Sequence, residues 1–337
     1  MIKILHNDEI NTTTWNKLFD DSSSSSFFQS VECYDFYKKL EFLTPFVIAV
    51  EENETLSALV CGYIIADGNK LKRYMSRRAI IPGGILLSNN ISVEALKILL
   101  LTLSEKLKSK AIYTEFRNYH NYSDKKEVFI QSGFKYRSHL NFQVPTVDVE
   151  TASKQLSSTK RRDIKLSLRE GAIIESNPSE IELKEFYEIL SDLYKTKIKT
   201  PLFPFEFFQK IITINENHLF LVKHQGSVVG GSLCVSCNNN ILYEWFVCGL
   251  DGKIKNVFPS TLATWAAIEY AASNKFRYFD MMGAGKPNEG YGVRDFKAKF
   301  GGSMVEHGRF IKINNKFLYK IGKIAVTYLK KKRLTIK

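Results

Sequence analysis

The chain has 337 residues, of which 44% are hydrophobic and 13% aromatic, so it has ample material for packed cores and is too long for one small domain. This composition disfavours disordered, collagen-like and coiled-coil proteins. No apolar run approaches the roughly 20 residues of a membrane span, and the N-terminal sequence MIKILHNDEI lacks a signal-peptide pattern. We therefore expect a cytoplasmic protein, and peripheral contact with the inner membrane surface stays open.

The net charge of +13 is concentrated at the C-terminal end. Beyond Glu306 there are ten Lys or Arg residues and no Asp or Glu, and subtracting these ten from +13 leaves +3 for residues 1–306. A basic amphipathic end suits anionic lipid headgroups or phosphates. A C-terminal helix with its lysines in water explains the same residues equally well.

The cysteines and histidines do not indicate a metal site. Five scattered cysteines indicate a reducing compartment and no disulfide framework. Cys234 and Cys237 form an isolated C-x-x-C motif, but residues three apart on an alternating strand point to opposite faces. None of the six histidines has metal-ligand spacing.

Helical and strand patterns alternate over the first 145 residues, as is typical of an α/β or α+β domain. The expected helices are 14–20, 31–40, 93–108 and 125–132. The expected strands are 45–51, 56–66, 70–76, a short strand within 80–88, 111–116 and 134–144.

The pattern restarts after a junction near residues 145–150, with a basic helix that Gly171 ends in a C-cap position. The expected helices are 157–170, 181–194, 204–212, 260–273 and 293–300. The expected strands are 218–223, 227–237, 241–248, 276–281 and 303–313. The repeated order indicates an internal duplication, with a first domain at 1–145 and a second at 146–315.

A glycine-rich loop follows the expected strand that contains Asp280. Its sequence from Gly283 to Pro287 is neither a Walker A phosphate loop nor a G-x-G-x-x-G dinucleotide motif. Polar groups just past a strand's carboxyl end commonly line an active-site crevice. This loop and the helix that begins near Asp295 are therefore the candidate site, and Asp280 is the best-placed carboxylate to accept or relay a proton.

Several short motifs resemble, in order and spacing, the FemABX family, whose members transfer amino acids from aminoacyl-tRNA to the peptide of a peptidoglycan precursor. The motifs are Phe28-Gln29-Ser30 with Tyr34 and Lys38, Lys160-Arg161-Arg162-Asp163-Ile164 before Gly171, Pro259 opening the helix of Trp265, Tyr278-Phe279-Asp280, Tyr291-Gly292-Val293, Phe296-Lys297 and Phe300-Gly301-Gly302. The similarity spans nearly the whole chain.

The resemblance implies two tandem GNAT-like acyltransferase domains, with residues 316–337 returning to complete the first. It implies an aminoacyltransferase with aminoacyl-tRNA as co-substrate, no resident cofactor and a nucleotide-linked or lipid-linked muropeptide as acceptor. Lys297, in the Phe296-Lys297 pair, would bind the developing oxyanion or the donor's terminal ribose, and Phe296 would contact the substrate. Candidates for the acceptor's phosphates are Lys38, Lys197, Lys199, Arg161 and Arg162.

Two other functions remain open. An acyl-CoA-dependent N-acyltransferase, with acetyl-CoA as donor and a surface-polysaccharide or nucleotide-sugar precursor as acceptor, would need a backbone cradle for pyrophosphate. That cradle would lie near Gly230-Gly231 or in the loop from Gly283 to Gly292. The second alternative is a non-catalytic GNAT-fold binding protein.

Overall fold

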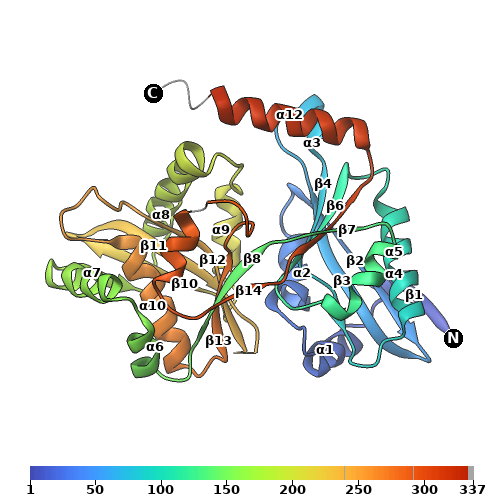
Figure 1. Cartoon of the computed structure of the whole chain (residues 1–337), viewed down its shortest axis with the longest axis horizontal. Coiled ribbons are helices and arrows are strands. Elements are labelled where there is room, and N and C mark those ends of the chain that lie inside the picture. The colour runs from blue at the N-terminus through green and yellow to red at the C-terminus, as the bar shows by residue number, and fades with distance from the viewer. Residues whose placement is uncertain (239, 291, 333–337) are drawn as a thin grey trace. The chain divides into compact units, whose positions relative to one another are not determined.

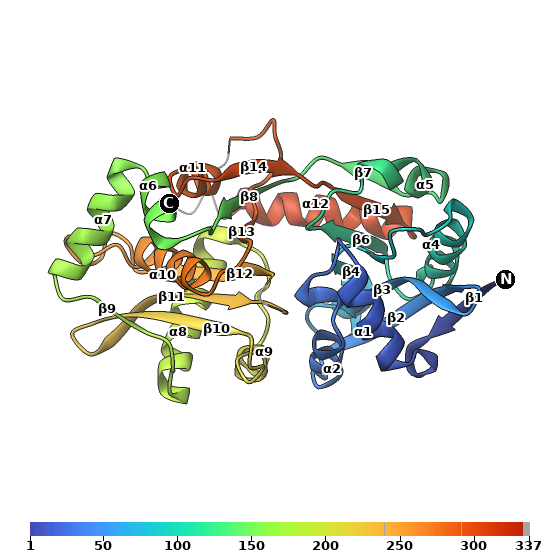
Figure 2. The same ribbon diagram turned by 90° about the horizontal axis from the view of Figure 1, so that it is seen from below.

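Two mixed β-sheets organise the chain, one in each of two units (Figures 1 and 2). The structure is a computed structural model that describes residues 1–238, 240–290 and 292–332. The first unit combines Met1–Ser138 with the segment that begins at His307, and the second unit is His139–Glu306.

The sheet of the first unit has the strand order β1-β2-β3-β4-β6-β15-β7, with β5 paired to β3. The pair β4 and β6 is parallel, and the other described pairs are antiparallel. The strands are β1 (Ile2–His6), β2 (Leu43–Glu52), β3 (Thr55–Ile65), β4 (Arg78–Gly83), β5 (Leu86–Leu87), β6 (Tyr113–Asn118), β7 (Lys135–Arg137) and β15 (Arg309–Ile313).

Helix α4 (Val93–Leu107) shows why the helices of this unit form where they do. The Ser92 hydroxyl accepts the Ala95 amide at 3.1 Å as an N-cap. Its buried leucines recur at helical spacing and pack on the sheet, and each contributes about 1.5–3 kcal/mol when fully buried. The other helices are α1 (Thr12–Asp21), α2 (Val31–Lys38), α3 (Lys70–Ser76), α5 (Lys126–Gln131) and α12 (Lys316–Lys332).

The expected strand at 70–76 is wrong, because this segment is helix α3. The Asn69 side chain caps it by accepting the Lys72 amide at 3.3 Å. All residues of Lys70–Met75 are exposed, and β3 already pairs with β2 and β4. The segment therefore has neither a buried face nor the adjacent strand edge that a sheet position would require.

The sheet of the second unit has the order β14-β8-β13-β12-β11-β10-β9, with β12 and β13 parallel. The strands are β8 (Leu140–Pro145), β9 (Ile173–Glu175), β10 (His218–His224), β11 (Ser227–Val235), β12 (Ile241–Gly249), β13 (Tyr278–Gly283) and β14 (Ser303–Glu306). The helices are α6 (Val149–Gln155), α7 (Ser158–Arg169), α8 (Glu180–Leu193), α9 (Phe205–Ile211), α10 (Pro259–Ser273) and α11 (Gly292–Ala298).

Helices α8 and α10 pack on opposite faces of the second sheet (Figure 2). On β11, a Cβ added to Gly231 would meet the Phe186 ring of α8 at 2.9 Å. The neighbouring Ser232 points to the other face, where its hydroxyl and that of Thr264 in α10 both donate to the Glu244 carboxyl. Because successive strand residues alternate between faces, each helix buries its own side of the sheet.

The units divide at 138/139 and 306/307, whereas the sequence placed the boundaries at 145/146 and 315/316. β8 pairs with β13 and β14, so residues 140–145 belong to the second sheet. The expected strand 303–313 is interrupted at Gly308, whose φ is +66°, and gives β14 to the second sheet and β15 to the first. Local periodicity does not reveal which sheet a strand joins.

None of the described helices is both long and apolar enough to span a lipid bilayer.

Candidate active site

The parallel strands β12 and β13 separate partway along their length. They pair from Ile241↔Tyr278 to Tyr243↔Asp280, and no pairing between them follows. In the first unit, the parallel strands β4 and β6 stay in register from Arg78↔Tyr113 to Gly83↔Asn118. Of the two described sheets, only that of the second unit therefore has parallel strands that separate. The main-chain groups at this point need hydrogen-bond partners other than the adjacent strand.

A β-bulge lies on β12 where the two strands separate. Leu233 is opposite Phe246 and Cys234 is opposite Glu244, so Trp245 is the extra residue of the bulge. Bulges bend a strand and redirect its side chains, and they occur often beside active sites. The bulge is adjacent to Glu244, whose Oε1 accepts from Ser232 Oγ at 3.1 Å and from Thr264 Oγ1 at 2.8 Å.

Lys297 of α11 reaches the main chain of β13 beyond the last paired residue. Its side chain is buried, and Nζ donates to the carbonyl oxygens of Met281 and, at 2.9 Å, Gly283. Burial lowers the pKa of Lys297, and the nearby carboxyls of Glu244 and Asp280 oppose that shift. An ammonium has three donors, and within the described residues two of them are used, so one remains for a ligand.

Asp280 is fully buried and supports the strand segment that holds Lys297. Its carboxylate accepts the Met282 amide at 2.6 Å, Gln143 Nε2 at 3.1 Å and Asn141 Nδ2 at 3.5 Å. Burial raises its pKa to about 6, and these hydrogen bonds and Lys297 oppose the rise. Met282 has a left-handed φ of +56° and lies between the two carbonyl groups that bind Lys297. The carboxylate thus holds this unusual backbone in place.

Glu244 is a second buried carboxyl beside Lys297, and the sequence analysis did not select it. Its Oε2 is buried without a hydrogen-bond partner, and burial raises the pKa of the group. No direct ion pair joins Lys297 to Glu244 or Asp280 in the described part of the chain. The sequence could have indicated Glu244, because it is an acidic residue within the apolar strand expected at 241–248 and burying an unpaired charge is costly.

Phe296, expected at the substrate, is half-buried against Lys160 of α7. The Lys160 ammonium lies 3.8 Å from the centre of the Phe296 ring and 4.9 Å from that of Phe300, and it donates to Thr261 Oγ1 at 2.6 Å. Burial lowers the pKa of Lys160 to about 8. The contact with Phe296 links α11 to α7, and the hydrogen bond to Thr261 links α7 to α10, so one face of the Phe296 ring has a structural role.

Arg294 fixes the glycine loop before α11. Its guanidinium donates to the carbonyl groups of Ala284 at 3.1 Å, of Pro287 at 3.3 Å and of Lys286. Arg294 and Lys297 are three residues apart on α11, so one helix face binds both the loop and the end of β13. Tyr291, which belongs to the family motif, lies outside the described residues.

Among the described residues, none of the basic side chains expected at phosphates forms a hydrogen bond or ion pair with Asp280 or Glu244. Lys38 is in the first unit, where it pairs with Asp35 at 2.7 Å. Arg162 pairs with the buried Asp163 at 3.1 Å, and the exposed Arg161 side chain donates to the Lys154 carbonyl group at 3.4 Å. Two further lysines lie at the end of the π-helical turn Tyr194–Ile198, the exposed Lys197 and Lys199, which has a left-handed φ of +59°.

The two glycines proposed as a pyrophosphate cradle lie inside a strand. Gly230 and Gly231 are in β11, and a Cβ on Gly230 would meet the Cys248 oxygen and the Pro259 side chain at 2.7 Å. They permit close packing of β11 rather than forming a loop. The N-terminal end of α10 binds the chain's own carboxylate, because Asp251 accepts the Ser260 amide at 3.3 Å and the Ser260 hydroxyl.

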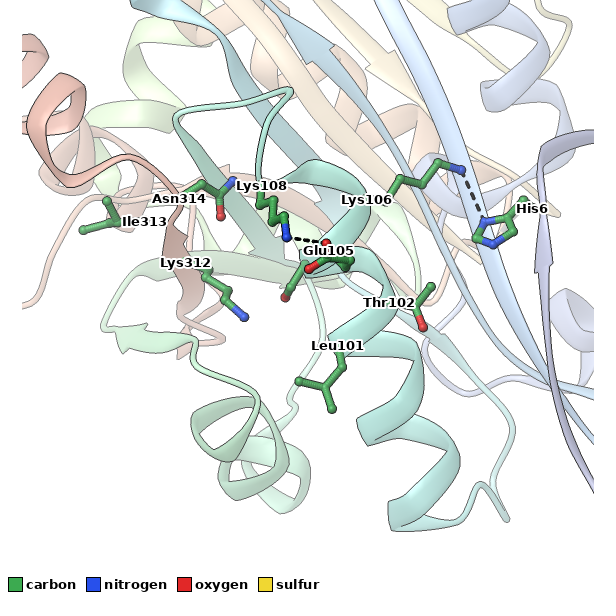
Figure 3. A pocket seen from close by; sticks show the side chains of 10 residues that line it. His6, Leu101, Thr102, Glu105, Lys106, Lys108, Lys312, Ile313 and Asn314 are labelled. Carbon is green, nitrogen blue, oxygen red and sulfur yellow. Dashed lines mark hydrogen bonds and ion pairs between the residues drawn. The ribbon is translucent and has the colours of Figure 1, made fainter.

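A pocket of about 940 Å³ in the first unit is lined by a different set of residues (Figure 3). Its cations already have partners in the chain. Lys108 pairs with Glu105, Lys106 lies 3.3 Å from His6 Nδ1, and Lys312 donates to the Ser132 carbonyl group at 2.8 Å. We assign no ligand to this pocket.

Gly302 allows the chain after α11 to pass close to β8. Its φ is +80°, and an added Cβ would overlap the Gln143 carbonyl oxygen. Gly302→Ala is expected to lower the free energy of unfolding by about 2–4 kcal/mol, measured by urea denaturation. In the control Gly290→Ala, an added Cβ meets nothing within 4 Å, and a change below about 1 kcal/mol is expected. If Gly302→Ala lowered the free energy of unfolding as little as Gly290→Ala, β8 would have shifted to accommodate the new methyl group.

Comparisons with known proteins address the fold and the family. FemX matches with a TM-score of 0.70 at 16% identity, covering 95% of this chain and 99% of that one. A tandem GNAT protein from the clavulanic acid biosynthesis pathway matches with a TM-score of 0.60 at 8% identity, covering 93% and 99%. L-PGS from Bacillus licheniformis matches with a TM-score of 0.57 at 13% identity, covering 95% and 96%. These likenesses confirm the expected tandem GNAT-like fold.

No curated protein sequence matches the chain. Residues 110–327, which include the split between β12 and β13 and all of α11, match the FemAB family. This match covers well over half of the sequence, and the chain therefore belongs to the FemAB family.

Proposed function

We propose that this protein transfers an amino acid from aminoacyl-tRNA to an amine of a peptidoglycan precursor, forming a peptide bond. Family membership makes the chain an acyltransferase, and the proposal concerns its donor and acceptor. The observation that carries it is Lys297, a buried ammonium held by two β13 carbonyl groups with its third donor unused among the described residues.

The third donor of Lys297 can bind the carbonyl oxygen of the aminoacyl ester. As the neutral acceptor amine attacks the ester carbon, negative charge develops on that oxygen, and a fixed donor in a site shielded from water stabilises it. The carbon–oxygen bond to the terminal ribose then breaks. The amine loses one proton and the departing ribose oxygen gains one, so no net proton is required.

Asp280 contributes indirectly in this mechanism. All its described hydrogen bonds are with groups of the chain, and it is fully buried, so it supports the Met281–Gly283 segment that orients Lys297. Lys38, Lys197, Lys199, Arg161 and Arg162 remain candidates for phosphates of the donor or the acceptor. Phe296 is only half-buried, and a substrate group can pack against its exposed part.

An acyl-CoA donor is the second candidate, and the geometry at the N-terminal end of α10 favours aminoacyl-tRNA over acyl-CoA. A pyrophosphate commonly binds backbone amides at a helix N-terminus. Here the Asp251 carboxylate occupies the Ser260 amide and would repel a diphosphate, and Gly230 and Gly231 form no loop around an anion.

The donor is tested by incubating purified protein with a cell-wall precursor pool and either charged total tRNA or acetyl-CoA, and following acceptor mass. We expect a mass gain of one amino-acid residue that ribonuclease pretreatment abolishes. A gain of one acetyl group would replace the proposal with the CoA-dependent activity. No gain from either donor, together with normal cellular function of Lys297→Ala, would favour a non-catalytic binding protein.

A further inference from the structure

Two helices of the first unit expose large apolar side chains next to each other. α3 and α12 are in contact, and Figure 1 shows them side by side. We call Lys70–Arg77 and Lys316–Ile324 the α3–α12 surface. Its exposed apolar residues are Leu71 (71%), Tyr74 (54%), Met75 (37%), Phe317 (72%) and Ile324 (62%). Such a concentration on a globular protein indicates an interaction site.

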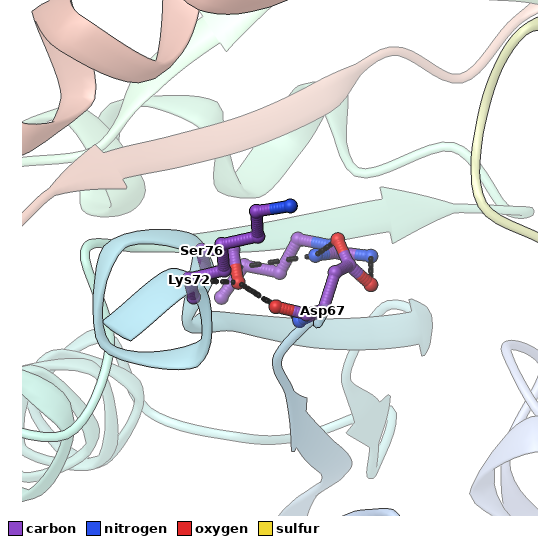
Figure 4. Close-up of polar contacts among 4 residues, drawn as sticks. Asp67, Lys72 and Ser76 are labelled. Carbon is purple, nitrogen blue, oxygen red and sulfur yellow. Dashed lines mark hydrogen bonds and ion pairs between the residues drawn. The ribbon is translucent and has the colours of Figure 1, made fainter. Parts of the chain in front are cut away.

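The charges of the α3–α12 surface all have one sign. It contains no Asp or Glu, and its cations are Lys70, Lys72, Arg73, Arg77, Lys316, Lys320 and Lys323. The adjacent Asp67 is neutralised by Arg78, with N···O distances of 2.6 and 3.2 Å. Asp67 also binds Ser76 through its main chain, which anchors the end of α3 (Figure 4).

Residues on the inner side of α12 attach the helix to the first unit, and the exposed apolar residues do not take part in these contacts. The Tyr319 ring lies 5.5 Å from that of Tyr113, and its hydroxyl accepts from Arg137 at 3.0 Å. At 100° per residue, Phe317, Lys320 and Ile324 lie on one arc of the helix, away from Tyr319. Phe317 and Ile324 are therefore not needed to attach α12 to its own unit.

We propose that the α3–α12 surface docks this protein on an anionic lipid bilayer. An interfacial helix combines a row of lysines with large apolar residues that enter the boundary between headgroups and acyl chains, and this surface has that arrangement on both helices. A nucleic-acid backbone would use the lysines but would leave Leu71, Met75, Phe317 and Ile324 without a partner. A second copy of this surface would present the same positive charges and be repelled.

The proposal is tested by sedimenting the full-length protein with vesicles at near-physiological salt. We expect binding to phosphatidylcholine vesicles that contain about one third phosphatidylglycerol, and at least about tenfold weaker binding to pure phosphatidylcholine. The double variants Leu71→Ser/Phe317→Ser and Lys320→Glu/Lys323→Glu should each weaken binding to anionic vesicles about tenfold or more. The matched control Lys253→Glu/Lys255→Glu changes net charge equally at exposed lysines of the second unit and should bind like the wild type.

Three results would overturn the proposal. They are equal binding to both vesicle types, wild-type binding by Leu71→Ser/Phe317→Ser, and a loss of binding in the control as large as in Lys320→Glu/Lys323→Glu. Competition by total RNA, with the apolar variant unaffected, would identify a nucleic-acid surface instead. Vesicle binding needs no acyl donor, so its outcome is independent of the proposed aminoacyl transfer. Circular dichroism of each variant distinguishes a docking defect from a folding defect.

Discussion

Lys297→Ala is expected to slow acyl transfer by about 10²- to 10³-fold, because it removes a fixed donor to the oxygen on which negative charge develops. The loss should appear in kcat, with little change in acceptor KM, since the interaction strengthens only in the transition state. The measurement is single-turnover transfer from charged tRNA to the acceptor.

Lys299→Ala is the matched control, because Lys299 is an exposed lysine two residues further along the chain. It is expected to transfer at the wild-type rate. Lys297→Met keeps much of the side-chain volume and separates loss of the donor from loss of packing. If Lys297→Met were as active as the wild type, the ammonium would have only a structural role, and the oxyanion assignment would fail.

The sequence indicated the region of the candidate site but not how its groups are held. The strand containing Asp280, the glycine loop and the helix with Lys297 follow each other in the chain, so local patterns and motif order were enough to place them together. Burial of Lys297 depends on the separation of β12 and β13, which is a feature of strand pairing across the sheet. That pairing leaves no mark in the periodicity of either strand.

Glu244 and Lys160 show the same limit. The partners of Glu244, Ser232 and Thr264, are 12 and 20 residues away, and the partner of Lys160, Thr261, is 101 residues away. Such contacts exist only after the sheet and its helices have assembled. Lys160 belongs to the motif Lys160-Arg161-Arg162-Asp163-Ile164, yet only its exposed neighbours Arg161 and Arg162 were predicted to bind phosphates.

Prediction of the fold from the sequence was limited in the same way. Element type was predictable wherever a segment had a clear buried face, as in α4 and α10, whose apolar residues fix the helix against its sheet. It failed at α3, where nothing is buried and capping by Asn69 decides the structure. It also failed at Gly308, where a left-handed residue divides one apparent strand between two sheets.

Asp280→Asn is expected to reduce activity while changing the pH dependence of stability. At pH 8 the ionised carboxylate accepts from Met282, Gln143 and Asn141, whereas an asparagine offers one acceptor oxygen and turns an NH₂ group toward donors. The segment that holds Lys297 should loosen, and transfer should slow about tenfold or more. Asp295→Asn, an exposed carboxyl on α11, is the control that should leave the rate unchanged.

The direction of the stability effect follows from the raised pKa of Asp280, about 6 in the folded protein against roughly 3.9 in an unfolded chain. The folded state holds this proton more tightly. Its contribution to stability is therefore fully present below about pH 4 and is lost as the pH rises through about 6. Between pH 8 and pH 5 the wild type should gain about 1 kcal/mol over Asp280→Asn, measured by urea denaturation at both pH values.

The pH profile of transfer separates Asp280 from the other buried carboxyl. In the wild type, kcat/KM corrected for the fraction of neutral acceptor amine should fall below about pH 6 and level off near the value of Asp280→Asn, as protonation removes an acceptor from the Asp280 cluster. In Asp280→Asn that acidic limb should be absent. If the limb persists, the titrating group is another one, and Glu244 is then the first to test, because burial also raises its pKa and its Oε2 has no hydrogen-bond partner. Glu244→Gln would then remove the limb that Asp280→Asn left in place.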